Sequence, residues 1–253
     1  RGLEIVAEGA LLEEDPAAPN NRGRQLRATD LGAAMFSDGG WDSYLEDVGT
    51  LWLIHWRLAS TPEPATTWWW VFNQYPGTDF TRRELQAQLE RFVAQLGSAR
   101  VSPASLKRDI DCFIRTYGAS RRARAVQEDT LDCPLVELGL LRERADHQSY
   151  QLVRGDHPTL PLAIFGYALA TYLERRGGHS QTVSLHELAF GEGTPGRVFS
   201  LSESGLLTRL EALGPLTAGA LVYDETAGLK QIFLHKSLHA RMLLERYYQA
   251  SQR

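Results

Sequence analysis

Cysteine is scarce in this chain: only Cys112 and Cys133 occur among 253 residues. Two thiols cannot build a disulfide framework or supply the four ligands of a structural zinc site, which excludes both of those protein classes. The low cysteine content fits a reducing, cytoplasmic compartment. No stretch approaches the roughly 18 uninterrupted apolar residues of a bilayer span, and no hydrophobic leader opens the chain. We therefore expect neither an integral membrane protein nor a membrane partner.

Several motifs that carry chemistry are also missing. The sequence has no GxxxxGK[ST] phosphate loop, no GxGxxG and no HExxH, so we expect no organic cofactor. His235 and His239 could share one face of a final helix expected over 235–248, but a metal site there would lack a third ligand. Neither cysteine has a histidine nearby in the sequence, which argues against a thiol nucleophile. The chain begins at Arg1 without a methionine, so we expect its true start to lie upstream.

Positive charge is concentrated in one segment. The net charge is −4, yet residues 78–126 contain ten basic and five acidic side chains, so this segment is +5 and the remainder −9. A basic segment in an acidic protein predicts a surface that faces a polyanion, although an ordinary solvated helix face would look the same. Of the 27 basic residues only three are lysine. Arginine's planar fork suits phosphate, but a coding bias would produce the same excess.

Local signals place the helices. Side-chain caps predict helix starts at Asp47 (helix from about Val48 to Ala59), Thr81–Glu84, Ser102–Pro103 and Ser184–Glu187. Residues 51–56 and 66–72 contain five of the six tryptophans and are apolar nearly all round, which predicts buried helices. His55 lies inside the first of these, so we expect a core histidine rather than a catalytic base.

A hairpin pattern recurs between the helices. At residues 9–27, 139–153 and 219–234, a short apolar strand is followed by a polar turn and a returning strand, which is typical of the wing of a winged helix. We predict a mostly α protein with small β-hairpin wings, built from tandem winged-helix-like modules. The expected divisions are a truncated winged-helix remnant with the Trp-rich helices over 1–77, a central DNA-binding module over 78–155, and a C-terminal helical or winged-helix-like module over 156–253.

The helix from Ser102 to Tyr117 is the one expected to meet DNA. At 100° per residue, Leu106, Ile110, Phe113 and Tyr117 share a buried face. The opposite face carries Arg108, Asp111 and Arg115, with Lys107 at its margin, and the second helix of a helix-turn-helix enters the major groove. Asp109 and Asp111 point roughly 200° apart, so they cannot form a ligand pair, and Asp111 is expected to pair with Arg108 or Arg115. The candidate DNA-binding residues are Arg82, Arg83, Ser105, Lys107, Arg108, Arg115, Arg121, Arg122 and Arg124.

An acidic loop lies earlier in the chain. Asp38, Asp42, Glu46 and Asp47 stand beside Trp41 and Tyr44. Clustered carboxylates could hold a magnesium or manganese ion for phosphodiester cleavage, with Asp42, Glu46 and Asp47 as candidate ligands. The alternative is a solvated loop in which Asp47 simply caps the next helix.

Three blocks together resemble a known family. They are residues 41–56 (WDSYLEDVGTLWLIHW), residues 65–73 (ATTWWWVFN) and residues 105–111 (SLKRDID). They are similar to a domain family whose members accompany bacterial DNA phosphorothioation operons, including the nickase component of the single-strand phosphorothioation defence system. The resemblance covers most of the chain. It implies double-stranded DNA as substrate and, as partners, a cysteine desulfurase and an ATP-dependent sulfur-inserting enzyme.

We therefore predict a DNA-binding, strand-nicking endonuclease that acts in DNA sulfur modification and phage defence. The alternative is a non-catalytic winged-helix DNA-binding or assembly subunit, or a transcriptional regulator. A homodimer would suit a two-fold DNA site. A tyrosine nucleophile, Tyr44 or Tyr117, is a further option, although Tyr117 falls on the core face of its helix. The candidate catalytic residues are Glu46, Asp47, Lys107 and Asp111.

Overall fold

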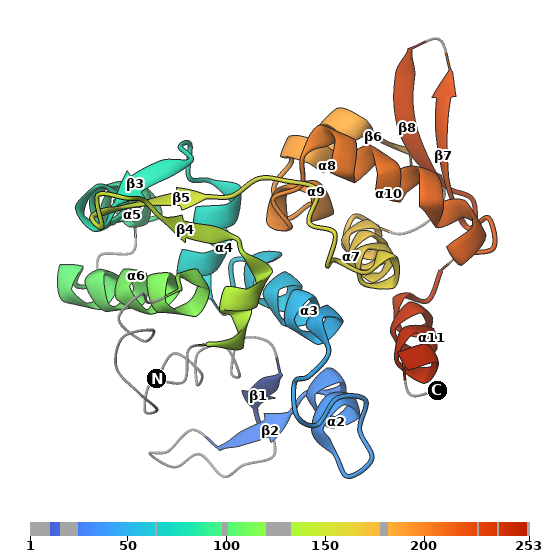
Figure 1. Ribbon diagram of the computed structural model, residues 1–253, viewed down its shortest axis with the longest axis horizontal. Helices are drawn as coiled ribbons and strands as arrows, with labels where there is room; N and C mark the ends of the chain where they lie inside the picture. The colour runs from blue at the N-terminus through green and yellow to red at the C-terminus, as the bar shows by residue number, and fades with distance from the viewer. Residues whose placement is uncertain are drawn as a thin grey trace. The chain divides into compact units, whose positions relative to one another are not determined.

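Helices dominate the computed structural model, and its described strands form small antiparallel sheets (Figure 1). This confirms a mostly helical chain with wing-like hairpins. The chain divides into two units, Arg1–Glu46 with Arg57–Val153 (unit 1) and Asp47–Trp56 with Arg154–Arg253 (unit 2). The expected three-segment division stays a prediction. None of the helices in the described part has the length and apolarity to cross a membrane. The structure describes residues 11–15, 25–63, 65–97, 101–119, 133–177, 182–226, 228–236 and 238–251.

In unit 1 the strand β3 lies in sequence between the helices α4 and α5, and the hairpin of β4 and β5 comes last. Its β3 pairs with β5, and β5 pairs with β4, so the strand order is β3-β5-β4. Phe80 lies opposite Tyr150 and Thr81 opposite Ser149. The elements are β1 (Leu12–Glu14), β2 (Leu26–Ala28), α2 (Asp30–Phe36), α4 (Thr66–Asn73), β3 (Asp79–Thr81), α5 (Arg82–Gln95), α6 (Pro103–Tyr117), a 3-10 turn (Pro134–Leu138), β4 (Leu141–Glu143) and β5 (Ser149–Leu152).

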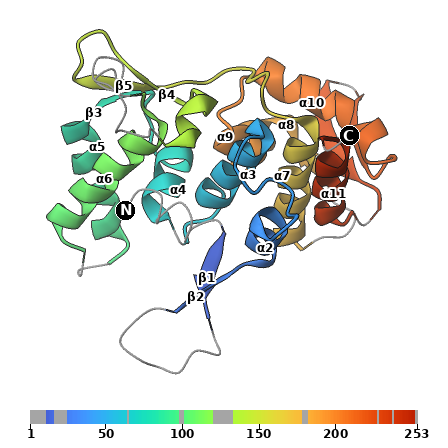
Figure 2. The same ribbon diagram turned by 60° about the horizontal axis from the view of Figure 1, so that its bottom comes forward.

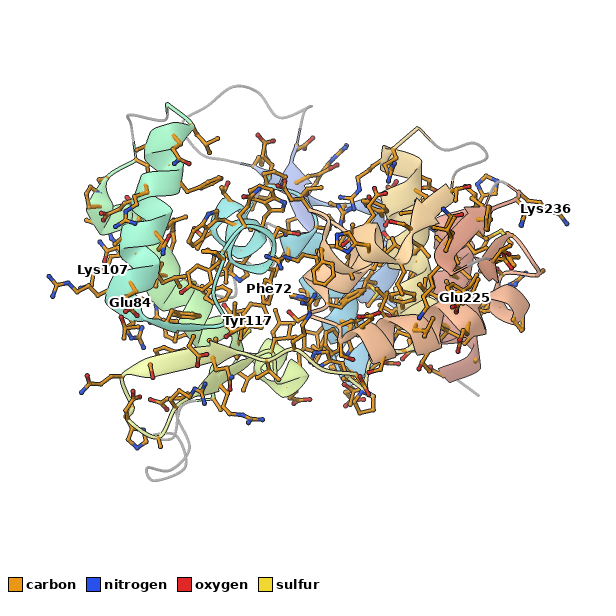
Figure 3. The ribbon with its side chains drawn as sticks, turned by 90° about the horizontal axis from the view of Figure 1, so that it is seen from above. Phe72, Glu84, Lys107, Tyr117, Glu225 and Lys236 are labelled. Atoms are coloured by element: carbon orange, nitrogen blue, oxygen red, sulfur yellow. The ribbon has the colours of Figure 1, made fainter. Side chains whose placement is uncertain are left out.

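Aromatic packing between α4 and α6 forms the core of unit 1. The two helices lie side by side in Figure 2 and are in contact. Phe72 packs against Tyr117 with ring centroids 5.3 Å apart, and Trp68 meets Phe113 edge-on at 6.0 Å. Figure 3 shows Phe72 and Tyr117 inside the unit. All four side chains are at most 4% exposed, which confirms the expected burial of the Trp-rich helix. Edge-on aromatic pairs stabilise a core beyond the area that they bury.

Unit 2 contains a three-stranded sheet with the same topology as that of unit 1. Its β6 pairs with β8, and β8 pairs with β7, giving the order β6-β8-β7. The predicted cap at Asp47 is confirmed, because the helix that follows begins at Val48 and ends at Ala59. The elements are α3 (Val48–Ala59, whose last three residues belong to unit 1), α7 (Leu162–Arg175), β6 (Thr182–Ser184), α8 (Leu185–Phe190), α9 (Pro195–Val198), α10 (Glu203–Leu216), β7 (Leu221–Thr226), β8 (Leu229–Leu234) and α11 (Ala240–Ser251).

The last helix starts later than the sequence predicted. It begins at Ala240 rather than at residue 235, because β8 continues to Leu234. The backbone N–H of His235 then donates to the carbonyl of Ala220 at 2.9 Å, which extends the strand pairing by one residue. His235 and His239 therefore precede the helix, and the expectation that they share its face is wrong.

A buried histidine lies in the core of unit 2. His55 is fully buried, as expected, and its Nε2 lies 2.8 Å from the carbonyl oxygen of Val198. Trp52 and Trp56 pack around Phe199 at centroid distances of 5.7 and 5.5 Å. Burial lowers the pKa of His55 to about 4, against the opposing effect of the Val198 hydrogen bond. The imidazole is therefore neutral in the folded protein at pH 7.

This histidine predicts a pH-dependent stability. The unfolded chain binds a proton at His55 below about pH 6.5, whereas the folded chain does so only near pH 4. Stability should therefore fall as the pH drops through this window, by about 2 kcal/mol between pH 7 and pH 5. Urea denaturation at both pH values measures it. The His55→Gln variant keeps a donor for Val198 but does not titrate, so it should lose less stability on acidification; an equal loss would contradict the assignment.

Candidate nucleic-acid interface

The helix α6 is built as the sequence predicts. The Ser102 hydroxyl accepts a hydrogen bond from the N–H of Ser105 at 3.2 Å, and Pro103 is the first helical residue. At the other end, the N–H of Gly118 donates to the carbonyl of Ile114. The four residues expected on the core face are all buried, with exposed fractions of 4% or less: Leu106, Ile110, Phe113 and Tyr117.

The opposite face of α6 is cationic. Lys107, Arg108 and Arg115 are exposed. Figure 3 shows Lys107 pointing away from unit 1. Within the described residues, Lys107 and Arg108 have no carboxylate partner, and Arg115 donates its Nε to the main-chain carbonyl of Asp111 at 3.2 Å. These three charges are therefore available to an external anion.

Asp111 is paired with a different helix. Its Oδ1 lies 2.7 Å from Nη1 of Arg82, the first residue of α5. The expectation that it pairs with Arg108 or Arg115 is wrong. The other end of the Arg82 guanidinium donates from Nη2 to the Tyr150 hydroxyl at 2.8 Å, and its central carbon lies 5.2 Å from the centre of that ring. One arginine thus joins α5, α6 and β5.

The other candidate DNA contacts differ in availability. Arg83 is exposed and has no ion-pair partner in the described part of the chain. Ser105 is half-buried, and its hydroxyl accepts from that of Ser102 at 3.1 Å. Arg142 on β4 was missed, although it is exposed and lies in the hairpin that the sequence predicted; the alternation of that strand could have identified it. The candidates Arg121, Arg122 and Arg124 lie outside the described residues.

The equivalent helix of unit 2 is α10, and its outer face lacks the cations of α6. Both α6 and α10 begin after a serine cap, Ser102 and Ser202, so equivalent residues differ by 100 in number. The core face is kept, because Leu206, Leu210, Leu213 and Thr217 are buried. Arg209 turns inward and donates to the carbonyls of Gly205 and His157. At the places of Lys107, Arg108, Asp111 and Arg115, α10 has Leu207, Thr208, Glu211 and Pro215.

The acidic carboxylates shape the backbone. Asp42 is only 9% exposed, and its Oδ1 accepts from the N–H of Glu46 at 2.9 Å. In unit 2, Oδ1 of Asp47 accepts from the N–H of Gly49 at 2.7 Å and from the Tyr247 hydroxyl at 2.6 Å. A side chain at Gly49 would collide with the Tyr247 ring, so glycine permits this approach.

The same carboxylates were the expected metal ligands. No group of three or more His, Cys, Asp or Glu side chains in the described part of the chain could hold a metal ion. The site of Asp42, Glu46 and Asp47 for magnesium or manganese stays a prediction.

The two candidate tyrosine nucleophiles differ in accessibility. Tyr117 is 0% exposed, and burial raises its pKa well above the usual range. Its hydroxyl is neither ionised near pH 7 nor reachable by DNA. Tyr44 is 86% exposed, so it is the accessible one of this pair.

Comparison with known proteins places this arrangement in a family. The family model described as "Protein of unknown function (DUF4007)" matches residues 10–248. The chain belongs to the DUF4007 family. It is also similar to two solved structures, described as "Magnesium ion-bound SspB crystal structure" and "SspB crystal structure", with TM-scores of 0.87 and 0.86. Each is 28% identical, and each match covers 98% of this chain and 74% of the other. A comparison with curated proteins found no match.

These contacts predict different stability effects for neighbouring acids of this DUF4007 chain. Asp47→Ala removes the acceptor for Gly49 and Tyr247 and should lower the free energy of unfolding by about 1–2 kcal/mol. Glu46 is exposed, so Glu46→Ala should change it by less than about 0.5 kcal/mol. Urea denaturation of both variants measures the difference. A larger loss for Glu46→Ala would contradict the structural role of Asp47.

Proposed function

We propose that this chain binds duplex DNA through α6 and acts as a strand-nicking endonuclease in bacterial DNA phosphorothioation and phage defence. The observation that carries the proposal is the exposed set of Lys107, Arg108 and Arg115 on a helix whose other face is core. Arginine and lysine side chains that lack a carboxylate partner are the groups that neutralise DNA phosphates. The similarity to the SspB structures supports the phosphorothioation context.

The order of elements supports a winged-helix interpretation of each unit. In unit 1 a helix, a strand, two helices and a hairpin follow one another, and unit 2 has this order with the short helix α9 added between the two helices. In both units the first strand pairs with the last strand of the hairpin. In that arrangement the helix just before the hairpin enters the major groove, and the hairpin lies beside the backbone. Unit 1 would then present α6 to the bases and Arg142 to a phosphate. The neutral and acidic outer residues of α10 favour DNA binding by unit 1 alone.

Cleavage needs a nucleophile in line with the scissile bond and positive charge near the phosphorus. Of the candidate catalytic residues, Lys107 would supply that charge, because it is exposed and has no carboxylate partner among the described residues. Asp47 and Asp111 are held in contacts, and Glu46 is exposed. One SspB structure is described as magnesium ion-bound, which makes magnesium the first ion to test. The partners in this proposal are a cysteine desulfurase and an ATP-dependent sulfur-inserting enzyme, with a homodimer at a two-fold site.

A second function is favoured by the state of the acidic groups. Asp42 and Asp47 accept backbone and side-chain hydrogen bonds, so their contacts have a structural role. The cationic face of α6 would serve equally well in a DNA-binding subunit or regulator that has no chemistry of its own. Such a subunit would retard DNA but leave it intact.

Charge reversal tests the DNA-binding surface. Arg108→Glu and Arg115→Glu should each weaken duplex binding by at least about tenfold at 0.1 M salt, because each replaces a phosphate contact with repulsion. Fluorescence anisotropy with a labelled duplex measures the dissociation constant. Arg246 on α11 is exposed and has no partner in the described residues, so Arg246→Glu is the matched control with unchanged binding expected. If all three variants change the dissociation constant equally, α6 is not the DNA interface.

Plasmid relaxation tests the chemistry. The chain is incubated with supercoiled plasmid in magnesium, in manganese and in EDTA, and open circles are quantified on a gel. We expect open circles with a divalent ion and none in EDTA. If the charge of Lys107 stabilises the transition state, Lys107→Ala should lower the rate at which open circles form by at least about tenfold. Supercoils that stay intact at protein concentrations that retard the band would instead support the binding subunit.

A further inference from the structure

Three residues on α6 form one row along its outer face. Lys107, Asp111 and Arg115 are spaced four apart, so each lies one turn from the next. A carboxylate in this row would ordinarily pair with the lysine one turn before it or the arginine one turn after it. Either pairing would withdraw a cation from an incoming phosphate, and a carboxylate left unpaired would repel it.

Neither pairing within the row is formed. The carboxylate of Asp111 instead bonds Nη1 of Arg82 at 2.7 Å. Arg82 is itself held, because its Nη2 donates to the Tyr150 hydroxyl at 2.8 Å and its central carbon lies 5.2 Å from the centre of that ring. Lys107 has no carboxylate partner in the described part of the chain. The side chains of Arg82 and Asp111 are 47% and 38% exposed, and ion pairs this exposed add little stability.

Unit 2 forms the same three-stranded sheet without the contacts that join Arg82, Asp111 and Tyr150 in unit 1, which we call the arginine network. Leu185 follows the cap of α8 as Arg82 follows the cap of α5, and it is buried. Ile232 lies opposite the residue before that cap, as Tyr150 does in unit 1. An acidic residue remains at Glu211, the place of Asp111. The order of strands and helices therefore does not need the arginine, and the network occurs in the unit whose helix displays cations.

We propose that Arg82 is a positioning residue that acts through Asp111: by holding this carboxylate, it keeps Lys107 unpaired and available to a DNA phosphate. Arg82 then makes no phosphate contact of its own, and Asp111 takes no part in chemistry. This inference rests on the proposed DNA binding by α6. In this proposal Arg82 is not a direct DNA contact, and Asp111 is not a catalytic acid.

The test is a double-mutant cycle read by DNA binding. Dissociation constants for a labelled duplex are measured over a series of salt concentrations for the unmodified chain, Arg82→Ala, Asp111→Asn and the double variant. Arg82→Ala should weaken binding about tenfold and reduce the slope of log affinity against log salt by about one, because Asp111 then captures Lys107. The double variant should regain the original slope and lie within about threefold of the original affinity. Asp111→Asn alone should change little.

Arg83→Ala is the matched control, because Arg83 neighbours Arg82 and has no carboxylate partner among the described residues. Adding Asp111→Asn to it should bring no recovery. Arg82→Gln, which shortens the chain less than alanine, repeats the cycle if the alanine variant folds poorly by circular dichroism.

The outcomes separate the two proposals. A double variant that stays as weak as Arg82→Ala means that Arg82 contacts phosphate itself, and it overturns the inference alone. The inference is also overturned if Asp111→Asn raises the DNA affinity equally in the presence and in the absence of the Arg82 side chain. An unmodified chain that does not bind DNA overturns the proposed function, and the positioning role with it.

Discussion

The antiparallel pairing of β3 with β5 fixes the start of α5, the helix whose first side chain contacts α6. This pairing places Phe80 opposite Tyr150 and therefore brings the start of α5 beside the closing strand of the hairpin. Thr81 ends the strand and caps α5, with its hydroxyl and the Glu84 carboxylate each accepting a backbone N–H. Arg82 follows directly, so a three-residue strand pair sets where its guanidinium lies. The contact to Asp111 and the open position of Lys107 depend on that placement.

Local signals in the sequence predicted much of this architecture. The caps at Asp47, Thr81 and Ser102 each lie where the structure begins a helix, because a cap depends on residues within one turn. The buried face of α6 follows from helical periodicity alone. The hairpins were predicted from short apolar runs separated by polar turns, and strand pairing at each of the three places confirms them.

Features that depend on distant residues could not be predicted in the same way. The partner of Asp111, Arg82, lies 29 residues away in the sequence, and the packing of α5 against α6 brings the two side chains together. The start of α11 is delayed because β8 pairs with β7 through Leu234, which helical periodicity at residues 235–239 does not reveal. The carboxylates of the acidic loop looked like metal ligands, whereas Asp47 is engaged by Tyr247, 200 residues further along the chain.

The scarcity of lysine gives α6 a chemical property of its own. The sequence has three lysines, and Lys230 and Lys236 both belong to unit 2. Lys107 is therefore the single side-chain amine of unit 1, and it lies exposed on the cationic helix face. Acylation of that amine would remove one positive charge while the arginines around it kept theirs. An amine-directed fluorophore or acetyl group would thus mark this surface of unit 1 at one point.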